Sequence, residues 1–478
     1  MRYLKYIGIG LIALTLLFVK CDRKDKTPPN VVFFLVDDLG WKDLSCYGSE
    51  FYNTPNLDEL AEEGVRFTDA YAACPVCSPR RAAIMTGKHP VTVNITDWIP
   101  GMGYKRADDP KLRPPEDIHN MPLEEVTLAE ALKEKGYKTF FAGKWHLGET
   151  AEYWPEHQGF DINKGGHNKG SPPRGYYSPY NNPRLEDGPE GEYLTDRIGD
   201  ESLKFLESID DNPFLLYLSF YTVHSPIQGC DKYDQHYLEE KQELTDRGEP
   251  KVRIEHRGKT RLNQSDHKYA AMVRSMDENV GKVLDKLEEL KLAENTIIIF
   301  TSDNGGLTTI RKYGPTSVLP LRAGKGWCYE GGIRVPLIVR TPEMDRGKIC
   351  SYPVTSMDYY PTILDLAGFP LKEKQHIDGE SFAGYLEKPG KKYDRTLVWY
   401  YPHYHGSTWR PGSAIRHNQW KLIEFYEEET VELYDLSEDI SERNDLADEM
   451  PEKAENLRKK MHAYIDKRGG KYPIRIDN

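Results

Sequence analysis

Apolar runs that fit buried strands alternate with helical patterns along most of this chain. Residues 31–36 form a continuous apolar run, and residues 137–141, 213–220 and 296–300 repeat the pattern. Such runs are typical of strands in a sheet that is covered on both faces. The sequence therefore predicts an α/β sandwich, in which helices flank a large central sheet.

Two helices of this sandwich are marked clearly. Residues 127–135 begin with the capping-box pair Thr127 and Glu130 and stop at Gly136. Residues 269–290 carry an amphipathic pattern over several turns. Both segments are predicted to be helices.

Polar residues follow the predicted strands where each strand ends. In open α/β sheets, functional sites lie beyond the carboxyl ends of the strands, so these residues are candidates for one site. Lys144 and His146 alternate and would point to one side of an extended segment. The candidates are Asp37, Asp38, Lys144, His146, His224, Asp303 and Asn304.

The composition and the hydrophobic pattern of the chain change after Gly379. Residues 388–392 have the composition of a linker. Three short strands are predicted beyond it, at residues 396–401, 420–425 and 431–434, followed by a helix over residues 452–465. We therefore expect a large N-terminal domain over residues 28–387 and a smaller α+β domain with a short antiparallel sheet over residues 393–470.

The first 20 residues resemble a signal peptide, because Arg2 and Lys5 precede an apolar stretch too short to span a bilayer. Cys21 follows directly, as in bacterial lipoproteins, although Lys20 stands where that pattern has a small residue. Cleavage without lipidation is the alternative. The segment predicts export to the periplasm, or to the outer membrane or cell surface as a lipoprotein of a bacterium.

Charge and cysteine content limit the classes of function. The formal charge of −12 becomes −15 without residues 1–20, because they hold Arg2, Lys5 and Lys20 and no acid. This acidity argues against a nucleic-acid partner and means that an anionic substrate requires a local basic pocket. Seven cysteines are too few for a disulfide scaffold. Cys74 and Cys77 form a C-x-x-C pair that could be a redox or zinc site, but no second pair accompanies it.

The acidic candidates form a set of hard oxygen ligands. Asp37, Asp38, Asp303 and Asn304 carry neither thiolate nor imidazole, which suits Ca²⁺ or Mg²⁺ and not zinc. The alternative is ordinary loop and turn chemistry, since aspartate and asparagine also cap helices and form turns.

The segment Cys77-Ser78-Pro79-Arg80-Arg81 resembles the maturation signature of type I sulfatases, in which the cysteine is oxidised to formylglycine. Arg80 departs from the small residue usual at its position and could alter maturation or local geometry. Further blocks resemble the arylsulfatase-like, bacterial polysaccharide branch of this family, so that the resemblance covers roughly residues 28–465. The blocks are residues 30–40, 54–58, 77–87, 143–148, 302–306, 321–336, 433–436 and 444–447.

This resemblance implies an alkaline-phosphatase-like fold, a bound Ca²⁺, and formylglycine generated from Cys77 by a formylglycine-generating or anaerobic sulfatase-maturing enzyme. It implies that Arg81 holds the formylglycine hydrate, that Lys144 and Lys325 bind sulfate oxygens, and that His146 takes a proton when sulfate is expelled. His224 would protonate the leaving oxygen. The implied calcium ligands are Asp37, Asp38, Asp303, Asn304 and the oxygen of matured Cys77.

The implied substrate is a sulfated saccharide that loses sulfate from its end, with galactose or N-acetylgalactosamine sulfate preferred. A phosphatase or phosphonate monoester hydrolase of the same superfamily is an alternative, and a non-catalytic sulfated-glycan-binding lipoprotein is another if Cys77 is not matured. Candidate sugar contacts in loop-like stretches are Asp97, Trp98, His167, Asn168, Arg174, His403, His405 and Arg410.

Overall fold

A large mixed β-sheet forms the centre of the molecule. The computed structural model describes residues 27–342 and 344–476. In this part of the chain the strand order is β12-β2-β11-β9-β1-β6-β4-β5, with β13 also paired to β2. All pairings are parallel except those of β11, which runs antiparallel to β2 and β9. The strands are β1 (Asn30–Val36), β2 (Val65–Tyr71), β4 (Lys138–Gly143), β5 (Ile162–Lys164), β6 (Phe214–Ser219), β9 (Thr296–Ser302), β11 (Arg334–Arg340), β12 (Lys348–Cys350) and β13 (Val354–Thr355).

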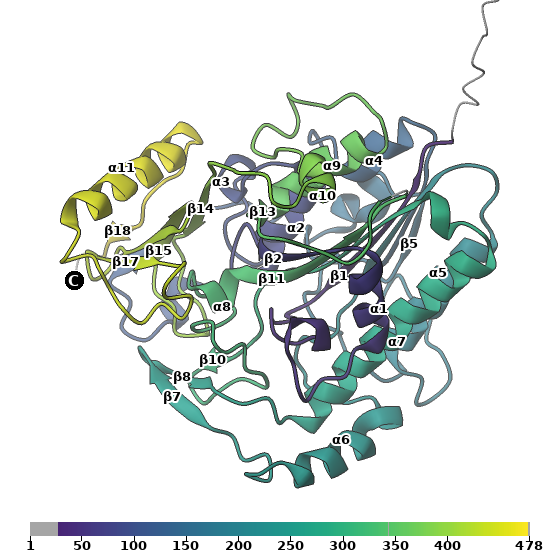
Figure 1. Cartoon of the computed structure of the whole chain (residues 1–478), viewed down its shortest axis with the longest axis horizontal. Helices are drawn as coiled ribbons and strands as arrows, with labels where there is room; N and C mark the ends of the chain where they lie inside the picture. Colours follow the sequence, from purple (N-terminus) through teal and green to yellow (C-terminus); the bar gives the residue numbers. More distant parts are fainter. Residues whose placement is uncertain (1–26, 343, 477–478) are drawn as a thin grey trace, which may run out of the picture.

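Helices cover both faces of this sheet (Figure 1). Alternate residues of β1 point to opposite faces, so Val32 and Phe34 pack in one core and Val31 and Phe33 in another. One face carries α1 (Pro55–Glu63), α5 (Leu194–Glu207), α6 (Asp231–Glu243) and α7 (His267–Glu289). The other carries α2 (Cys77–Thr86), α3 (Pro90–Val93), α4 (Leu128–Lys133), α9 (Tyr359–Leu366) and α10 (Ala383–Glu387).

A separate four-stranded antiparallel sheet lies towards the C-terminus, in the order β14-β15-β16-β17. One face packs on α11 (Pro451–Lys467), and the other packs on the main body through residues such as Trp399 and Trp327. The strands are β14 (Thr396–Tyr401), β15 (Gly412–His417), β16 (Trp420–Phe425) and β17 (Thr430–Asp435).

Smaller elements complete the described chain. A three-stranded sheet has the order β10-β8-β7, and β18 pairs with β3. None of the described helices is long and apolar enough to cross a membrane. Apart from six short 3-10 helices, the remaining elements are β3 (Leu112–Arg113), β7 (Val252–Glu255), β8 (Gly258–Arg261), β10 (Thr309–Ile310), α8 (Glu330–Ile333) and β18 (Ile474–Arg475).

The predicted fold class is confirmed: a large mixed sheet is flanked by helices, and a small antiparallel sheet follows. The capping box is also confirmed, since the Thr127 hydroxyl accepts from the Glu130 amide at 3.1 Å and the Glu130 carboxylate accepts from the Thr127 amide at 2.8 Å. The prediction missed β2, β11 and β15. The division at residues 387 and 393 stays a prediction, and the proposed signal segment and Cys21 lie outside the described residues.

Candidate active site

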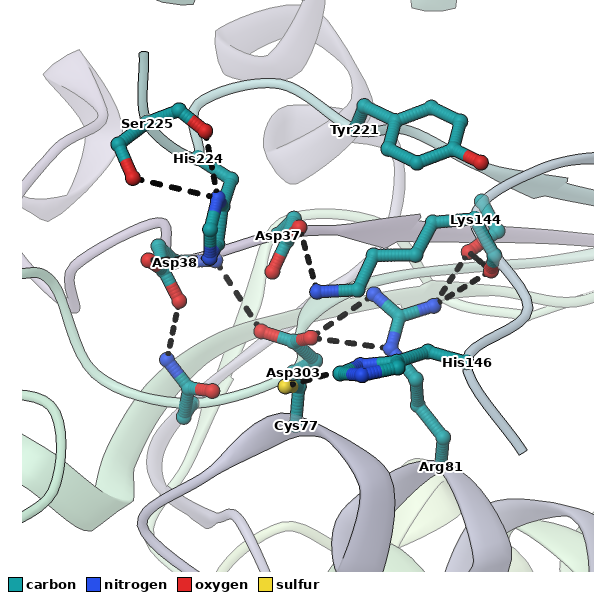
Figure 2. Close-up of polar contacts among 12 residues, drawn as sticks. Asp37, Asp38, Cys77, Arg81, Lys144, His146, Tyr221, His224, Ser225 and Asp303 are labelled. Carbon is teal, nitrogen blue, oxygen red and sulfur yellow. Dashed lines mark hydrogen bonds and ion pairs between the residues drawn. The ribbon is translucent and has the colours of Figure 1, made fainter. Parts of the chain in front are cut away.

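The carboxyl ends of four neighbouring parallel strands supply the site. β9, β1, β6 and β4 lie side by side and run in the same direction, so the residues that follow them meet at one edge of the sheet. Asp303 follows β9, Asp37 follows β1, His224 comes shortly after β6, and Lys144 follows β4. Figure 2 shows these side chains pointing towards one another.

The acidic residues are fully buried and close together. Asp303 accepts a hydrogen bond from the Asp38 amide at 3.1 Å, and Asn304 donates to the Asp38 carboxylate at 2.8 Å. Oxygens of Asp37 and Asp38 lie within 4.8 Å of one another and of a His224 ring nitrogen. Two buried oxygens, Asp37 Oδ1 and Asn304 Oδ1, have no hydrogen-bond partner among the described residues. Hard oxygen donors left unpaired in this way fit a divalent cation.

Three buried cations face the acidic residues. Arg81 donates to Asp303 through Nε at 3.1 Å and Nη2 at 2.8 Å (Figure 2). Lys144 Nζ lies 2.8 Å from Asp37, and Lys325 Nζ lies 2.7 Å from Asp38.

These pairings set the charge of the acids. Burial alone would raise the pKa of Asp303, but Arg81 and the two lysines hold it well below the ordinary value. Burial raises the pKa of Asp37, and Lys144 only partly offsets this. The acids therefore differ in how firmly they hold their charge, and Asp303 is the one kept ionised most firmly.

Cys77 is the first residue of α2, so its side chain lies at the positive end of a helix. Arg81 follows one turn later and points to the same side. Pro79 lies inside the first turn of this helix, where its missing N–H costs no hydrogen bond. The helix start thus presents residue 77 to the three cations.

His146 lies beside Cys77, with Nδ1 3.3 Å from Sγ. Its Nε2 lies 2.5 Å from the Ile99 carbonyl oxygen, which can only accept, so the ring proton is on Nε2 and the Nδ1 lone pair faces Cys77. Burial and the nearby Lys144 lower the pKa of His146. The prediction of an extended 144–146 segment was wrong, because His146 has a left-handed φ of 60°.

His224 is held from its other side. Its Nδ1 donates to the Ser225 carbonyl at 2.8 Å, which leaves Nε2 facing Asp38 at 3.8 Å. Burial and the positive charge of Lys325 lower the pKa of His224 to about 3. The ring is therefore neutral at neutral pH in this arrangement.

Arg80 lies beside this site but does not enter it. Its guanidinium is buried and donates to the Thr301 hydroxyl at 3.1 Å and to the Tyr359 hydroxyl at 3.5 Å, while Nε and Nη1 have no partner among the described residues. Its bulk therefore occupies the core between β9 and α9 and leaves the space around Cys77 open.

A cavity of about 570 Å³ opens above Cys77. The predicted sugar contacts Trp98, Asn168 and His405 line it, together with five residues of the charged centre. The other lining residues were not predicted, because all but Ile310 of β10 lie on loops and none belongs to a recognisable motif. The complete lining is Asp38, Cys77, Trp98, Ile99, Pro100, His146, Glu149, Asn168, Lys169, Gly170, Ser171, His224, Ser225, Leu307, Ile310, Lys325, His405, Gly406 and Ser407.

The other five predicted sugar contacts do not line this cavity. Asp97 accepts a hydrogen bond from the Tyr401 hydroxyl, and His403 bonds the Thr96 hydroxyl, so both are used in packing.

The remaining three are held elsewhere. His167 is buried with its ring edge-on to Trp154, Arg410 forms a buried ion pair with Glu427, and Arg174 is exposed on the surface. All five residues were predicted as sugar contacts because they lie in loop-like stretches. Four of them are buried and pack inside the protein, and only Arg174 is exposed.

One contributor to the centre was overlooked although a signal existed. Ser219, the last residue of β6, accepts a hydrogen bond from Arg81 Nη1 at 2.7 Å, and so does the Lys144 carbonyl at 2.7 Å. The strand itself was predicted, so its polar final residue was a readable candidate. It fixes the Arg81 guanidinium on the side opposite to Asp303.

Three buried cations and Cys77 lie at the carboxyl ends of neighbouring strands of an α/β sheet, and fixed positive charges of this kind suit the binding of an anion. A family model described as Sulfatase matches residues 29–369, and one described as N-sulphoglucosamine sulphohydrolase, C-terminal, matches residues 323–469. The chain belongs to the sulfatase family, and the expectation of a sulfatase enzyme is confirmed.

Relatives span most of the chain. A sulfatase of Formosa agariphila is 33% identical over 94% of this chain and 90% of its own length. Human N-acetylgalactosamine-6-sulfatase is 30% identical over 78% of this chain and 68% of its own length. The crystal structure of Ps i-CgsB in complex with k-i-k-neocarrahexaose has a TM-score of 0.74 and 29% identity, covering 92% of this chain and 93% of that one. The chain spans 64% of mouse arylsulfatase J, about two thirds of that relative.

Proposed function

We propose that this chain hydrolyses sulfate monoesters on a sulfated carbohydrate, acting at chain ends with a preference for galactose or N-acetylgalactosamine sulfate. The observation that carries this proposal is the position of Cys77, at the start of α2, between three buried cations and at the base of a cavity of about 570 Å³. Pockets of about 300–1,000 Å³ enclose most of a small ligand, which supports action on a terminal sugar.

The proposed cofactors are a Ca²⁺ ion and formylglycine made from Cys77. The residues present fit both, because Asp37 and Asn304 have unpaired buried oxygens and Cys77 lies among cations that favour anionic groups. Asp37, Asp38, Asp303 and Asn304 would hold the ion together with the matured residue. When present, the formylglycine hydrate supplies a nucleophilic hydroxyl and the calcium ion offsets negative charge on the sulfate group.

The chain's own residues would bind and orient the sulfate group. Lys144 and Lys325 each have an ammonium within 3 Å of an acid and face the same centre, so they are placed to bind sulfate oxygens. Arg81 is fixed by Asp303, Ser219 and the Lys144 carbonyl, and it would orient the group at position 77. Such fixed charges act strongly because no reorganisation is needed as charge develops.

Two histidines would move protons at opposite ends of the reaction. The bare Nδ1 of His146 faces position 77 and can take a proton from the group there. The Nε2 of His224 faces Asp38 and lines the cavity, so it can give a proton to the leaving oxygen once it has acquired one. Because its pKa is low in the unliganded arrangement, the negative charge of bound substrate would have to raise it.

The proposed substrate follows from two relatives and from the cavity wall. The name of human N-acetylgalactosamine-6-sulfatase supports an N-acetylgalactosamine sulfate, and the complex of Ps i-CgsB with k-i-k-neocarrahexaose supports a saccharide substrate. Trp98 lines the cavity and offers a flat apolar face of the kind that packs on sugar rings.

The proposed partners and location concern parts of the chain beyond the site. A formylglycine-generating or anaerobic maturing enzyme would convert Cys77. Export to the periplasm or cell surface, with a lipid anchor at Cys21, rests on the sequence pattern of residues 1–21. The net charge of −12 argues against a nucleic-acid partner, because a protein that binds nucleic acid is expected to have a basic surface.

The test is to produce the full chain with a maturing enzyme, measure the mass of the tryptic peptide that contains Cys77, and assay sulfate release from sulfated saccharides. We expect conversion of the thiol to the aldehyde and release from galactose or N-acetylgalactosamine sulfates. Unmodified Cys77 with tight glycan binding and no release would support a binding protein instead. Faster release of phosphate than of sulfate would support a phosphatase.

A further inference from the structure

The loop between β14 and β15 of the small sheet reaches the wall of the cavity beside Lys325. His405, Gly406 and Ser407 of this loop line the cavity. The loop is closed by a hydrogen bond from the His405 amide to the Trp409 carbonyl at 3.2 Å. It is fixed to the main body because Trp327 Nε1 donates to the Ser407 carbonyl at 3.0 Å.

A glycine next to Lys325 allows this close approach. A Cβ atom on Gly326 would lie 2.1 Å from His405 Nδ1 and 2.5 Å from Ser407 Oγ, and Gly326 has a φ of 81°. Any other residue would therefore displace the loop and also adopt a disfavoured backbone conformation. The imidazole of His405 is thus held one residue away from the lysine that would bind sulfate oxygens.

Ser407 fixes which ring nitrogen of His405 carries the proton. The Ser407 backbone amide, which can only donate, lies 3.1 Å from His405 Nδ1, and the Ser407 hydroxyl lies 2.8 Å from the same atom. Nδ1 is therefore the acceptor, and in the neutral ring the proton is on Nε2. Burial and the charge of Lys325 lower the pKa of His405 to about 3, so the ring is neutral at neutral pH.

The Nε2–H group has no protein acceptor among the residues that the structure describes. The hydrogen bonds of the His405 ring all involve Nδ1, whereas Nε2 keeps some exposure on a side chain that lines the cavity. A neutral, oriented N–H donor adds no positive charge beside Lys325, so it can hydrogen-bond an uncharged substrate oxygen while Lys325 remains the group placed to bind the sulfate.

We propose that His405 is a specificity-determining residue whose Nε2–H donates a hydrogen bond to an uncharged oxygen of the sugar, a hydroxyl or a ring or glycosidic oxygen, next to the sulfate ester. This inference rests on the proposed function and names the group of the substrate that the small sheet recognises. An aryl sulfate has no such oxygen, so its hydrolysis should not depend on His405.

The test compares two substrates, phenyl sulfate and a sulfated galactose or N-acetylgalactosamine saccharide, in the matured full-length enzyme. His405→Ala should lower kcat/KM for the saccharide by about 10-fold, mainly through KM, and change kcat/KM for the aryl sulfate by less than about 2-fold. His405→Gln can place an amide N–H near the same point and should recover part of the loss.

His403→Ala is the matched control, because His403 is buried two residues earlier and does not line the cavity. It should affect both substrates alike. Equal losses on both substrates for His405→Ala, no loss on the saccharide, or a glutamine variant no better than alanine would each overturn the assignment. Failure of the wild-type enzyme to release sulfate from any saccharide while it cleaves the aryl sulfate would instead overturn the proposed carbohydrate function.

Discussion

Two buried clusters of charged side chains differ in whether their oxygen atoms all have partners within the protein. The first is the catalytic cluster, made of Asp37, Asp38, Asp303, Arg81, Lys144 and Lys325. The second, which we call the interface cluster, lies where α8 and β11 meet the small sheet and consists of Glu330, Glu442, Arg334 and Lys421. The side chains of both clusters are buried, so the charges in each depend strongly on their neighbours.

In the interface cluster each acid has close protein partners. Lys421 Nζ lies 2.9 Å from Glu330 and 2.7 Å from Glu442. Arg334 Nε lies 2.6 Å from Glu330, and the Glu330 amide donates to Glu442 at 2.7 Å. Lys421 belongs to β16 and Glu330 to α8, so this cluster joins the small sheet to the main body.

The catalytic cluster is arranged differently. Glu442 Oε1 of the interface cluster has no hydrogen bond, but it lies 2.7 Å from the Lys421 ammonium. Asp37 Oδ1 and Asn304 Oδ1 have neither a hydrogen-bond partner nor an ion-pair partner among the described residues, because Lys144 pairs with the other oxygen of Asp37. These two oxygens are therefore available to a bound ligand. Burial and ion pairing alone therefore do not mark a functional site. Buried carboxylate and amide oxygens that have no partner in the protein indicate a bound ligand.

The largest expected effect is on activity in the catalytic cluster. Asp38→Asn should lower kcat/KM by about 10³-fold or more, because it removes a ligand charge and the partner of Lys325. In the wild type, Ca²⁺ at 100 times its Kd should stabilise the fold by about 2.7 kcal/mol, seen as a rise in Tm over an EDTA-treated sample. The variant should lose most of that rise.

Asp277→Asn is the control for this variant, since Asp277 is also buried but bonds Asn56 and Leu57 outside the cavity. It should keep the Ca²⁺-dependent rise in Tm. An unchanged rise in Asp38→Asn would contradict the proposed ligand set.

The next effect is on stability in the interface cluster. Lys421→Met leaves Glu330 and Glu442 buried without their shared cation and should cost about 3–5 kcal/mol of unfolding free energy. Urea unfolding measures this loss, and Lys460→Met, at an exposed position, should leave stability nearly unchanged. Adding Glu442→Gln to Lys421→Met should recover part of the loss. A fully additive double variant would show that the two residues do not interact.

A smaller effect is a pH dependence of stability. Burial and the neighbouring Glu330 raise the pKa of Glu442 to about 7 despite Lys421. Between its unfolded pKa of about 4.3 and pH 7 the unfolded chain has already released this proton and the folded chain has not, so this group makes stability fall as pH rises.

Glu442→Gln cannot ionise and should therefore gain about 1–3 kcal/mol over the wild type between pH 5 and pH 8. Melting curves across this range measure the gain. For Glu438→Gln, at an exposed neighbouring position, stability should change with pH in the same way as in the wild type. A parallel curve for Glu442→Gln as well would disprove the raised pKa.

The smallest effect is expected at Arg80. Its guanidinium has hydroxyl partners only and two unpaired nitrogens, so replacing it with an apolar side chain of similar length costs little. Arg80→Met should stay within about 1 kcal/mol of the wild type in unfolding free energy and within about 3-fold in kcat/KM. Loss of conversion at Cys77, seen by peptide mass, would instead show that Arg80 takes part in maturation.

Sequence located the catalytic cluster because its residues follow recognisable strands or lie in a local motif. It missed β2 and β11 for physical reasons. Polar residues such as Arg66 and Asp69 interrupt the apolar pattern of β2, and Pro336 interrupts β11. Both strands are placed by pairing with each other across a long stretch of chain, which no local pattern records.

Local sequence also could not decide which of two neighbouring histidines contacts the cavity. His403 and His405 belong to one loop and have similar surroundings in the sequence, but only His405 lines the cavity. The difference arises because the loop packs on Gly326 and Trp327, nearly 80 positions earlier. Contacts of that kind depend on the assembled fold.

The direction of β1 has a consequence for how the proposed lipid anchor would present the enzyme. β1 starts at Asn30 and ends beside the cavity, and seven strand residues span about 23 Å. The described chain therefore begins at the edge of the sheet opposite the cavity, so whatever is joined to the protein before residue 27 is attached on the side away from the cavity.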